Sequence, residues 1–201
     1  MASVTATRCY SSNGPTDMRR LLLLALVLLL AACQGAPPRP ALPALALSPS
    51  SFGAELSLVQ RLRAGPLNPR DGQASPSLDV QLEIDAAQLR LAGLALGQRI
   101  LTLSWDGKTL QSQRSPLLPA SVDEARIVRD IQLAYWPLPA LRAALPAGWT
   151  LDEESGARVL RQDGEEALRI ENQASPAWLG HSELTNRREG YRLSIDSAPL
   201  Q

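Results

Sequence analysis

The sequence predicts an α+β domain in which an antiparallel β-sheet is covered by helices from the middle of the chain; if the sheet curves strongly, these helices form a lid over it. Three observations lead to this fold class. Apolar and polar residues alternate in segments on both sides of the middle of the chain, a helical period replaces that alternation near residues 124–135, and turn sequences separate the strand-like segments. Because a sheet with one apolar face must bury it, we expect the helices to pack across that face.

The clearest strand is predicted at residues 77–85, where Leu78, Val80, Leu82 and Ile84 alternate with polar residues. Such alternation is typical of an antiparallel sheet that is covered on one side only. A first strand is expected to start at Phe52, with Ala54, Leu56, Leu58 and Leu62 on one face. Further strands are predicted at 88–94, 99–105, 109–113, 158–161, 167–172, 182–186 and 191–196. Asp106-Gly107 and Asp163-Gly164 are typical hairpin turns between strands.

Two helices are predicted in the middle of the chain. Residues 121–124 fit a capping box, and an apolar face of a helix that ends at Pro137 is formed by Ile127, Val128, Ile131, Ala134 and Tyr135. A second short helix is expected from Pro139 to about Leu145. Leu133 and Trp136 point away from the main apolar face, so they either reach a cavity or make a second contact with the core.

The N-terminus carries the pattern of an export signal. Arg19 and Arg20 precede an apolar run over residues 21–32, which is shorter than the roughly 20 residues that a membrane-spanning helix needs. We therefore predict a signal peptide at residues 1–32, and Met18, directly before the two arginines, is a candidate for the true start. Residues 33–51 contain five prolines among small residues and are expected to form an extended tether, followed by one domain over residues 52–197.

The segment Leu30-Ala31-Ala32-Cys33 resembles the lipobox of bacterial lipoproteins. This resemblance implies that Cys33 is acylated and becomes the first residue of the mature chain, which would be anchored in a membrane through its acyl chains. The alternative is an ordinary signal peptide with a chance cysteine. By resemblance to the sorting rule of enteric bacteria, Gln34 after the cysteine implies the outer membrane, on its periplasmic face.

Composition and motifs argue against several other functions. Removing Arg8, Arg19, Arg20 and Asp17 with the signal leaves 17 basic and 19 acidic residues, so the chain has no basic excess and we expect no nucleic-acid partner. The chain has one histidine, His181, and Cys33 would be consumed by acylation, which excludes a cysteine–histidine pair and a multi-histidine metal site.

We accordingly predict no enzyme activity, no catalytic residue, no metal and no cofactor. The adjacent acids Glu165-Glu166 and 152–154 lie near predicted turns and are expected to be solvated. A hydrolase that uses paired carboxylates stays an alternative. Such an enzyme would need two acids that face one cleft at a defined separation.

Several strings together resemble a known family of proteobacterial lipoproteins: Gly97-Gln98-Arg99-Ile100-Leu101, Trp105-Asp106-Gly107, Ile131-Gln132-Leu133-Ala134-Tyr135-Trp136-Pro137, Gly148-Trp149 and Gly190-Tyr191-Arg192-Leu193. That family is classed as a domain of unknown function, is often encoded beside aryl-polyene pigment genes, and the resemblance covers most of residues 52–196. It in turn resembles the LolA/LolB lipoprotein-carrier superfamily, whose half-open barrel and helical lid enclose an apolar cavity for acyl chains.

This resemblance implies an outer-membrane-anchored protein that binds a lipid, a lipoprotein acyl chain or an aryl-polyene-type lipid, and so assists its transport or localisation. A periplasmic carrier protein would be a further partner. Candidate ligand-binding residues are Leu101, Leu103, Trp105, Leu133, Trp136 and Trp149. The alternative is a structural lipoprotein that docks on a partner, with these residues filling an ordinary core. A continuous hollow under the helices favours the carrier, and a filled core with an exposed apolar patch favours docking.

Overall fold

The computed structural model describes residues 41–69 and 77–200. The predicted signal peptide, Cys33 and the first part of the predicted tether lie outside these ranges. Within them, no helix is both long and apolar enough to cross a membrane.

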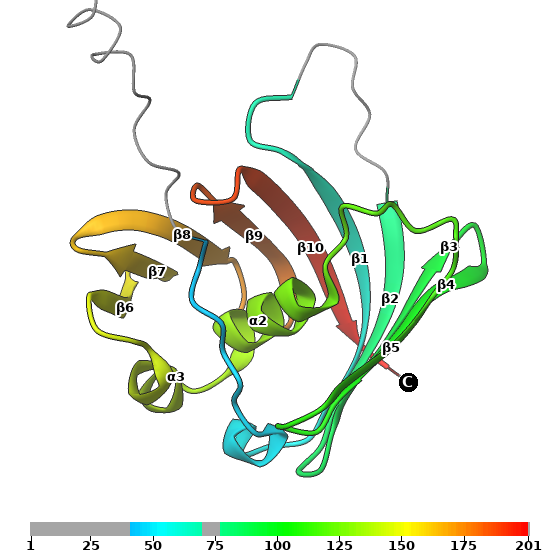
Figure 1. The fold of residues 1–201 in the computed structure, drawn as a ribbon, viewed down its shortest axis with the longest axis horizontal. Coiled ribbons are helices and arrows are strands. Elements are labelled where there is room, and N and C mark those ends of the chain that lie inside the picture. The colour runs from blue at the N-terminus through cyan, green and yellow to red at the C-terminus, as the bar shows by residue number, and fades with distance from the viewer. Residues whose placement is uncertain (1–40, 70–76, 201) are drawn as a thin grey trace, which may run out of the picture. The chain divides into compact units, whose positions relative to one another are not determined.

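Ten antiparallel strands form one sheet, in the order β5-β4-β3-β2-β1-β10-β9-β8-β7-β6 (Figure 1). The strands are β1 (Leu56–Pro66), β2 (Ser77–Ile84), β3 (Leu89–Ala95), β4 (Gln98–Trp105), β5 (Leu110–Arg114), β6 (Trp149–Glu154), β7 (Ala157–Gln162), β8 (Glu165–Asn172), β9 (Gly180–Asn186) and β10 (Tyr191–Pro199). The helices are α2 (Glu124–Tyr135) and α3 (Leu138–Ala144), with a short 3₁₀ helix, η1 (Pro49–Phe52), near the start of the described chain.

The path of the chain explains why the helices lie in the middle of the sequence. β1 is central and pairs with both β2 and β10. From β1 the chain moves strand by strand to the edge strand β5, crosses through α2 and α3 to the opposite edge strand β6, and returns strand by strand to β10. The sheet is not closed, because β5 and β6 each pair with one neighbour only. The prediction of an α+β fold with an antiparallel sheet and two mid-chain helices is confirmed.

The core lies between the sheet and α2, around which the sheet curves (Figure 1). In β2, Val80, Leu82 and Ile84 are buried while Asp79 and Gln81 are exposed, as the alternation predicts. On α2, Val128 and Ala134 are among the buried apolar residues that pack in the same cluster. One face of the sheet is therefore apolar and covered, and the other is polar.

Helix α2 differs from its prediction at its start and in its buried face. Asp123, not Ser121, is the N-cap: its carboxylate accepts from the backbone N–H groups of Ala125 and Arg126, at 2.9 and 3.2 Å. Leu133 and Trp136 are fully buried, so the second of the two alternatives for them, a core contact, is the one observed. The buried side also includes Arg129, Asp130 and Gln132, which an apolar pattern cannot reveal.

The predicted tether is wrong for the part that the structure describes. Residues 41–53, here called the strap, pack on the domain: Leu42, Leu45 and Phe52 belong to the core. Apart from η1, the strap forms neither helix nor strand, and the leucines between its prolines are buried against the domain. Phe52 accordingly ends η1, and the first strand begins only at Leu56.

One strand of the structure, β6, is absent from the elements predicted above. β6 was not predicted because Leu151 is its one fully buried residue and acidic residues follow it. At the other end, β10 continues to Pro199, two residues beyond the predicted domain boundary.

Candidate ligand-binding site

The structure brings the predicted ligand-binding residues into one apolar cluster. Leu101, Leu103 and Trp105 come from β4, and Leu133 and Trp136 come from α2 and the residue after it; all five are buried. Trp149, at the start of β6, is half-buried at the edge of this cluster, with the Arg188 guanidinium 5.9 Å from its ring centre. The predicted lipidation site Cys33 lies outside the described residues.

Two of the predicted tryptophans hold the strap. Trp105 Nε1 donates to the backbone oxygen of Leu47 at 2.8 Å. Trp136 Nε1 donates to Ser51 Oγ at 3.0 Å, and its ring centre lies 5.1 Å from that of Phe52. The indoles thus combine apolar contact with a hydrogen bond, the two capacities that distinguish tryptophan from other large side chains.

Gln132 is a third contact to the strap, and the sequence did not single it out. Its Nε2 donates to the same Leu47 oxygen, at 3.1 Å, and the residue is fully buried. Its Oε1 is buried and has no hydrogen-bond partner among the residues that the structure describes. A buried acceptor without a donor costs roughly 1–3 kcal/mol, so this atom is a place where a ligand donor would be stabilising.

The C-terminal end of α2 is fixed to the sheet by Arg158 of β7. Its Nη1 donates to the backbone oxygens of Leu133, Ala134 and Trp136, at 3.1, 3.0 and 2.8 Å. These are carbonyl groups that a helix end leaves without partners inside the helix. Only 9% of Arg158 is exposed, so the guanidinium acts as a buried cap for the helix.

A charged cluster, here called the latch, joins α2 to the β9–β10 turn; it consists of Arg129, Asp130, Glu189 and Tyr191. Arg129 donates to both Glu189 carboxylate oxygens, at 2.7 and 2.9 Å, and to Asp130. The Tyr191 hydroxyl donates to Asp130. Glu189 also accepts from the backbone N–H of Leu42, at 3.2 Å, so the strap is tied to the same cluster.

The pKa values of the two carboxyls of the latch are shifted in opposite directions. Burial raises the pKa of Asp130, and the neighbouring Arg129 does not fully offset this. Burial also pushes the pKa of Glu189 upward, but the hydrogen bonds and charge of Arg129, with the Leu42 N–H and Arg126, outweigh it, so that pKa lies below its ordinary value. Glu189 therefore keeps its charge to a lower pH than an ordinary glutamate, and it pairs with Arg129.

A hollow of about 500 Å³ lies away from the predicted residues, over β1, β2 and β10. It is lined by Val59, Gln60, Arg61, Asp79, Val80, Gln81, Leu94, Gly97, Asp196, Ser197 and Ala198. Leu96, next to Gly97 in the β3–β4 turn, is fully exposed at 104% and has a positive φ of 50°. None of the six predicted ligand-binding residues lines this hollow.

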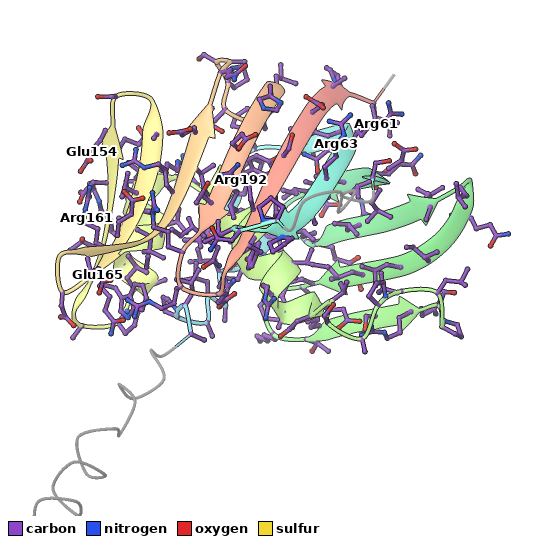
Figure 2. The ribbon with its side chains drawn as sticks, turned by 90° about the horizontal axis from the view of Figure 1, so that it is seen from above. Arg61, Arg63, Glu154, Arg161, Glu165 and Arg192 are labelled. Atoms are coloured by element: carbon purple, nitrogen blue, oxygen red, sulfur yellow. The ribbon has the colours of Figure 1, made fainter. Side chains whose placement is uncertain are left out.

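Ion pairs between neighbouring strands cover the polar face of the sheet. Arg61 pairs with Asp79 at 3.1 Å, and Arg161 with Glu154 at 2.7 Å; Figure 2 shows these arginines on the strands, with Arg63 beside Arg61. Arg192 lies 3.8 Å from Glu183.

His181 and the acidic pairs are also engaged in such contacts. His181 Nδ1 lies 2.8 Å from Asp196, and its Nε2 lies 3.8 Å from Glu183. Glu166 pairs with Arg169 and Arg187. Over residues 41–69 and 77–200, no three histidine, cysteine or acidic residues are grouped as a metal site would require.

The arrangement of strands and helices defines the class of protein: an α+β protein whose open, ten-stranded antiparallel sheet curves around a mid-chain helix. The model of the family described as "Protein of unknown function (DUF3261)" matches residues 60–199, and the chain belongs to this family. A comparison with curated proteins finds no match.

Proposed function

We propose that the protein is an outer-membrane lipoprotein, anchored through Cys33, that binds a lipid or acyl chain between its sheet and its covering segments and assists transport or localisation of that lipid. The main support for this proposal is the way in which the apolar face of the sheet is covered. The apolar face of an unclosed sheet is covered by α2 and the strap, neither of which is a strand of the sheet. An elongated apolar ligand can therefore enter by displacing the cover while the strand pairing stays intact.

The covering contacts are of a kind that a ligand can replace. Each methylene that leaves water contributes about 0.8 kcal/mol, so an acyl chain offsets the loss of several buried side chains of the cover. The resemblance of the family to the LolA/LolB carriers, whose half-open barrel encloses acyl chains, supports the same class of ligand. Among lipids, the lipoprotein acyl chain and the aryl-polyene-type lipid are the candidates that the family resemblance implies, with a periplasmic carrier protein as donor or acceptor.

The test is native mass spectrometry with lipid extraction on the chain carrying Cys33→Ser, purified from a periplasm that makes its natural lipids, followed by titration with a fluorescent fatty acid. We expect a stoichiometric co-purifying acyl or polyene species. Ile131→Gln, on the half-buried side of α2, should weaken fatty-acid binding about fivefold or more, since it places an amide against the ligand chain. The exposed Leu117→Gln is the matched control and should bind like the parent chain.

A second candidate function is docking on a partner without a ligand. It is favoured by the full burial of Leu133 and Trp136 among core side chains and by Leu96, which is fully exposed in the β3–β4 turn. A folded protein that carries no lipid and takes up no fatty acid would reject the carrier and leave this docking function.

A further inference from the structure

Side chains from other parts of the chain hold the strap, mainly by contacting its backbone, as a binding protein holds a bound peptide. The hydrogen bonds that join it to α2 and the sheet all come from side chains of those elements: Trp105 and Gln132 on the Leu47 oxygen, and Trp136 on Ser51 and Ser48. Glu189 adds an acceptor for the Leu42 N–H. The contacts to the Leu47 and Ser48 oxygens involve the backbone of the strap, so another chain with a suitably placed carbonyl can use the same donors. The contact to Ser51 Oγ involves a side chain of the strap.

The apolar side chains of the strap are buried as those of a bound apolar ligand would be. Leu42, Leu45 and Phe52 enter the core from a segment outside the sheet, at exposures of 5, 7 and 5%. Phe52 lies against the rings of Trp136 and Trp178, at 5.1 and 5.9 Å between ring centres. An apolar chain with one polar acceptor therefore already occupies the space beside α2.

The two donors on the Leu47 oxygen define the chemistry of this position. Trp105 Nε1 and Gln132 Nε2 converge on one carbonyl oxygen inside a cluster that is otherwise apolar. Beside them, Gln132 Oε1 is an acceptor without a donor among the described residues. An amide offers both an oxygen for the two donors and an N–H for this acceptor, whereas an alkane offers neither.

We infer that the strap is a built-in occupant of the ligand site, and that the ligand is an acyl chain with an amide carbonyl that displaces the strap and places its oxygen where the Leu47 oxygen lies. This inference rests on the proposed function and adds to it the class of ligand and the competition with residues 41–53. Binding is then weakened by the fraction of molecules whose strap is closed.

The test compares strap variants in the full chain, with Cys9→Ser and Cys33→Ser to prevent lipid attachment and oxidation. The probes are a pyrene-labelled dodecanoic methylamide and the corresponding pyrene alkane, titrated by fluorescence. Leu45→Ser and the milder Ser51→Ala, which removes the hydrogen bond from Trp136 to Ser51 Oγ, should each tighten methylamide binding, Leu45→Ser by about tenfold, because apparent affinity rises with the open fraction. Leu117→Ser, at an exposed position outside the strap, is the control and should leave binding unchanged.

Trp105→Phe tests the carbonyl position separately, because it keeps the ring and removes the Nε1 donor. It should reduce the preference for the methylamide over the alkane by about fivefold, the effect of one hydrogen bond, whatever it does to the strap. Thermal unfolding followed by circular dichroism checks that each variant is folded. If Leu45→Ser does not fold, Ser51→Ala alone tests the competition between strap and ligand.

The outcomes separate the two proposals. Equal binding by the parent chain and both folded strap variants would overturn the competition by the strap and leave the proposed function standing. An unchanged probe preference in Trp105→Phe would overturn the amide position. If neither probe binds any folded variant, the proposed function fails, and this inference fails with it.

Discussion

Arg158 shows how a single residue can hold a covering element in place. It is nearly buried in β7, yet it donates to three backbone oxygens at the end of α2, 22 to 25 residues earlier in the chain. Removing it would leave these oxygens without their partner. The sequence around β7 reads as a strand with a surface arginine, so nothing in the pattern reveals this role.

We predict that Arg158→Met lowers the free energy of unfolding by about 3 kcal/mol or more, since buried carbonyl oxygens lose their donor. Arg161→Met is the matched control: it removes an exposed ion pair on the same strand and should cost much less stability than Arg158→Met. Urea denaturation followed by circular dichroism measures both. Equal losses for the two variants would show that Arg158 does not act as a buried cap.

At the scale of elements, the latch joins three segments that are distant in sequence. Glu189 follows β9, Arg129 lies on α2, and the Leu42 N–H belongs to the strap. The latch therefore sets how α2 and the strap sit against the β9–β10 turn.

The latch predicts a dependence of stability on pH. Because the pKa of Glu189 is lower in the folded chain than its ordinary value of 4.5, its charge stabilises the fold above pH 4.5, and this contribution is lost as the pH falls through the folded-state value. Glu189→Gln should therefore be less stable than the parent chain by about 1–3 kcal/mol near neutral pH, and the difference should shrink below pH 4.5.

Urea denaturation at about pH 7 and about pH 3 measures this difference. Glu83→Gln, which removes an exposed pair with Arg90, is the control and should have little effect at either pH. A difference between parent and Glu189→Gln that stays constant over this range would mean that the charge of Glu189 does not stabilise the latch.

At the scale of the whole molecule, the domain includes the strap. The family match covers residues 60–199, but the core also contains side chains from residues 42–52. A chain that starts at residue 52, the boundary predicted from the sequence, would expose the surface that the strap covers. The start at residue 40 coincides with the compact unit of the structure.

We expect residues 52–201 to be less stable than residues 40–201 by roughly 3 kcal/mol or more, because burial of a leucine side chain contributes about 1.5–3 kcal/mol and two are lost. The midpoint of urea denaturation for the two chains is the measurement. Equal midpoints would indicate that the strap adds nothing to the core, which would also remove the basis for its competition with a ligand.

The sequence by itself determined the class of the fold and most of its elements. Alternation in β2 and the helical period of α2 identify strands and a helix, because a residue that must be buried repeats with the period of its own backbone. It also singled out Trp105, Leu133 and Trp136, which the structure buries in one apolar cluster. These inferences depend on local pattern alone.

Only the tertiary structure decided what covers the sheet and which polar residues are buried. Gln132 and Arg158 belong to patterns that look exposed, and they are buried because carbonyl partners arrive from other parts of the chain. The strap looked like a tether for a related reason. A proline-rich segment has no period of its own, and its leucines are buried only because they pack with core residues from other parts of the chain. Burial of this kind depends on distant partners, which local sequence does not encode.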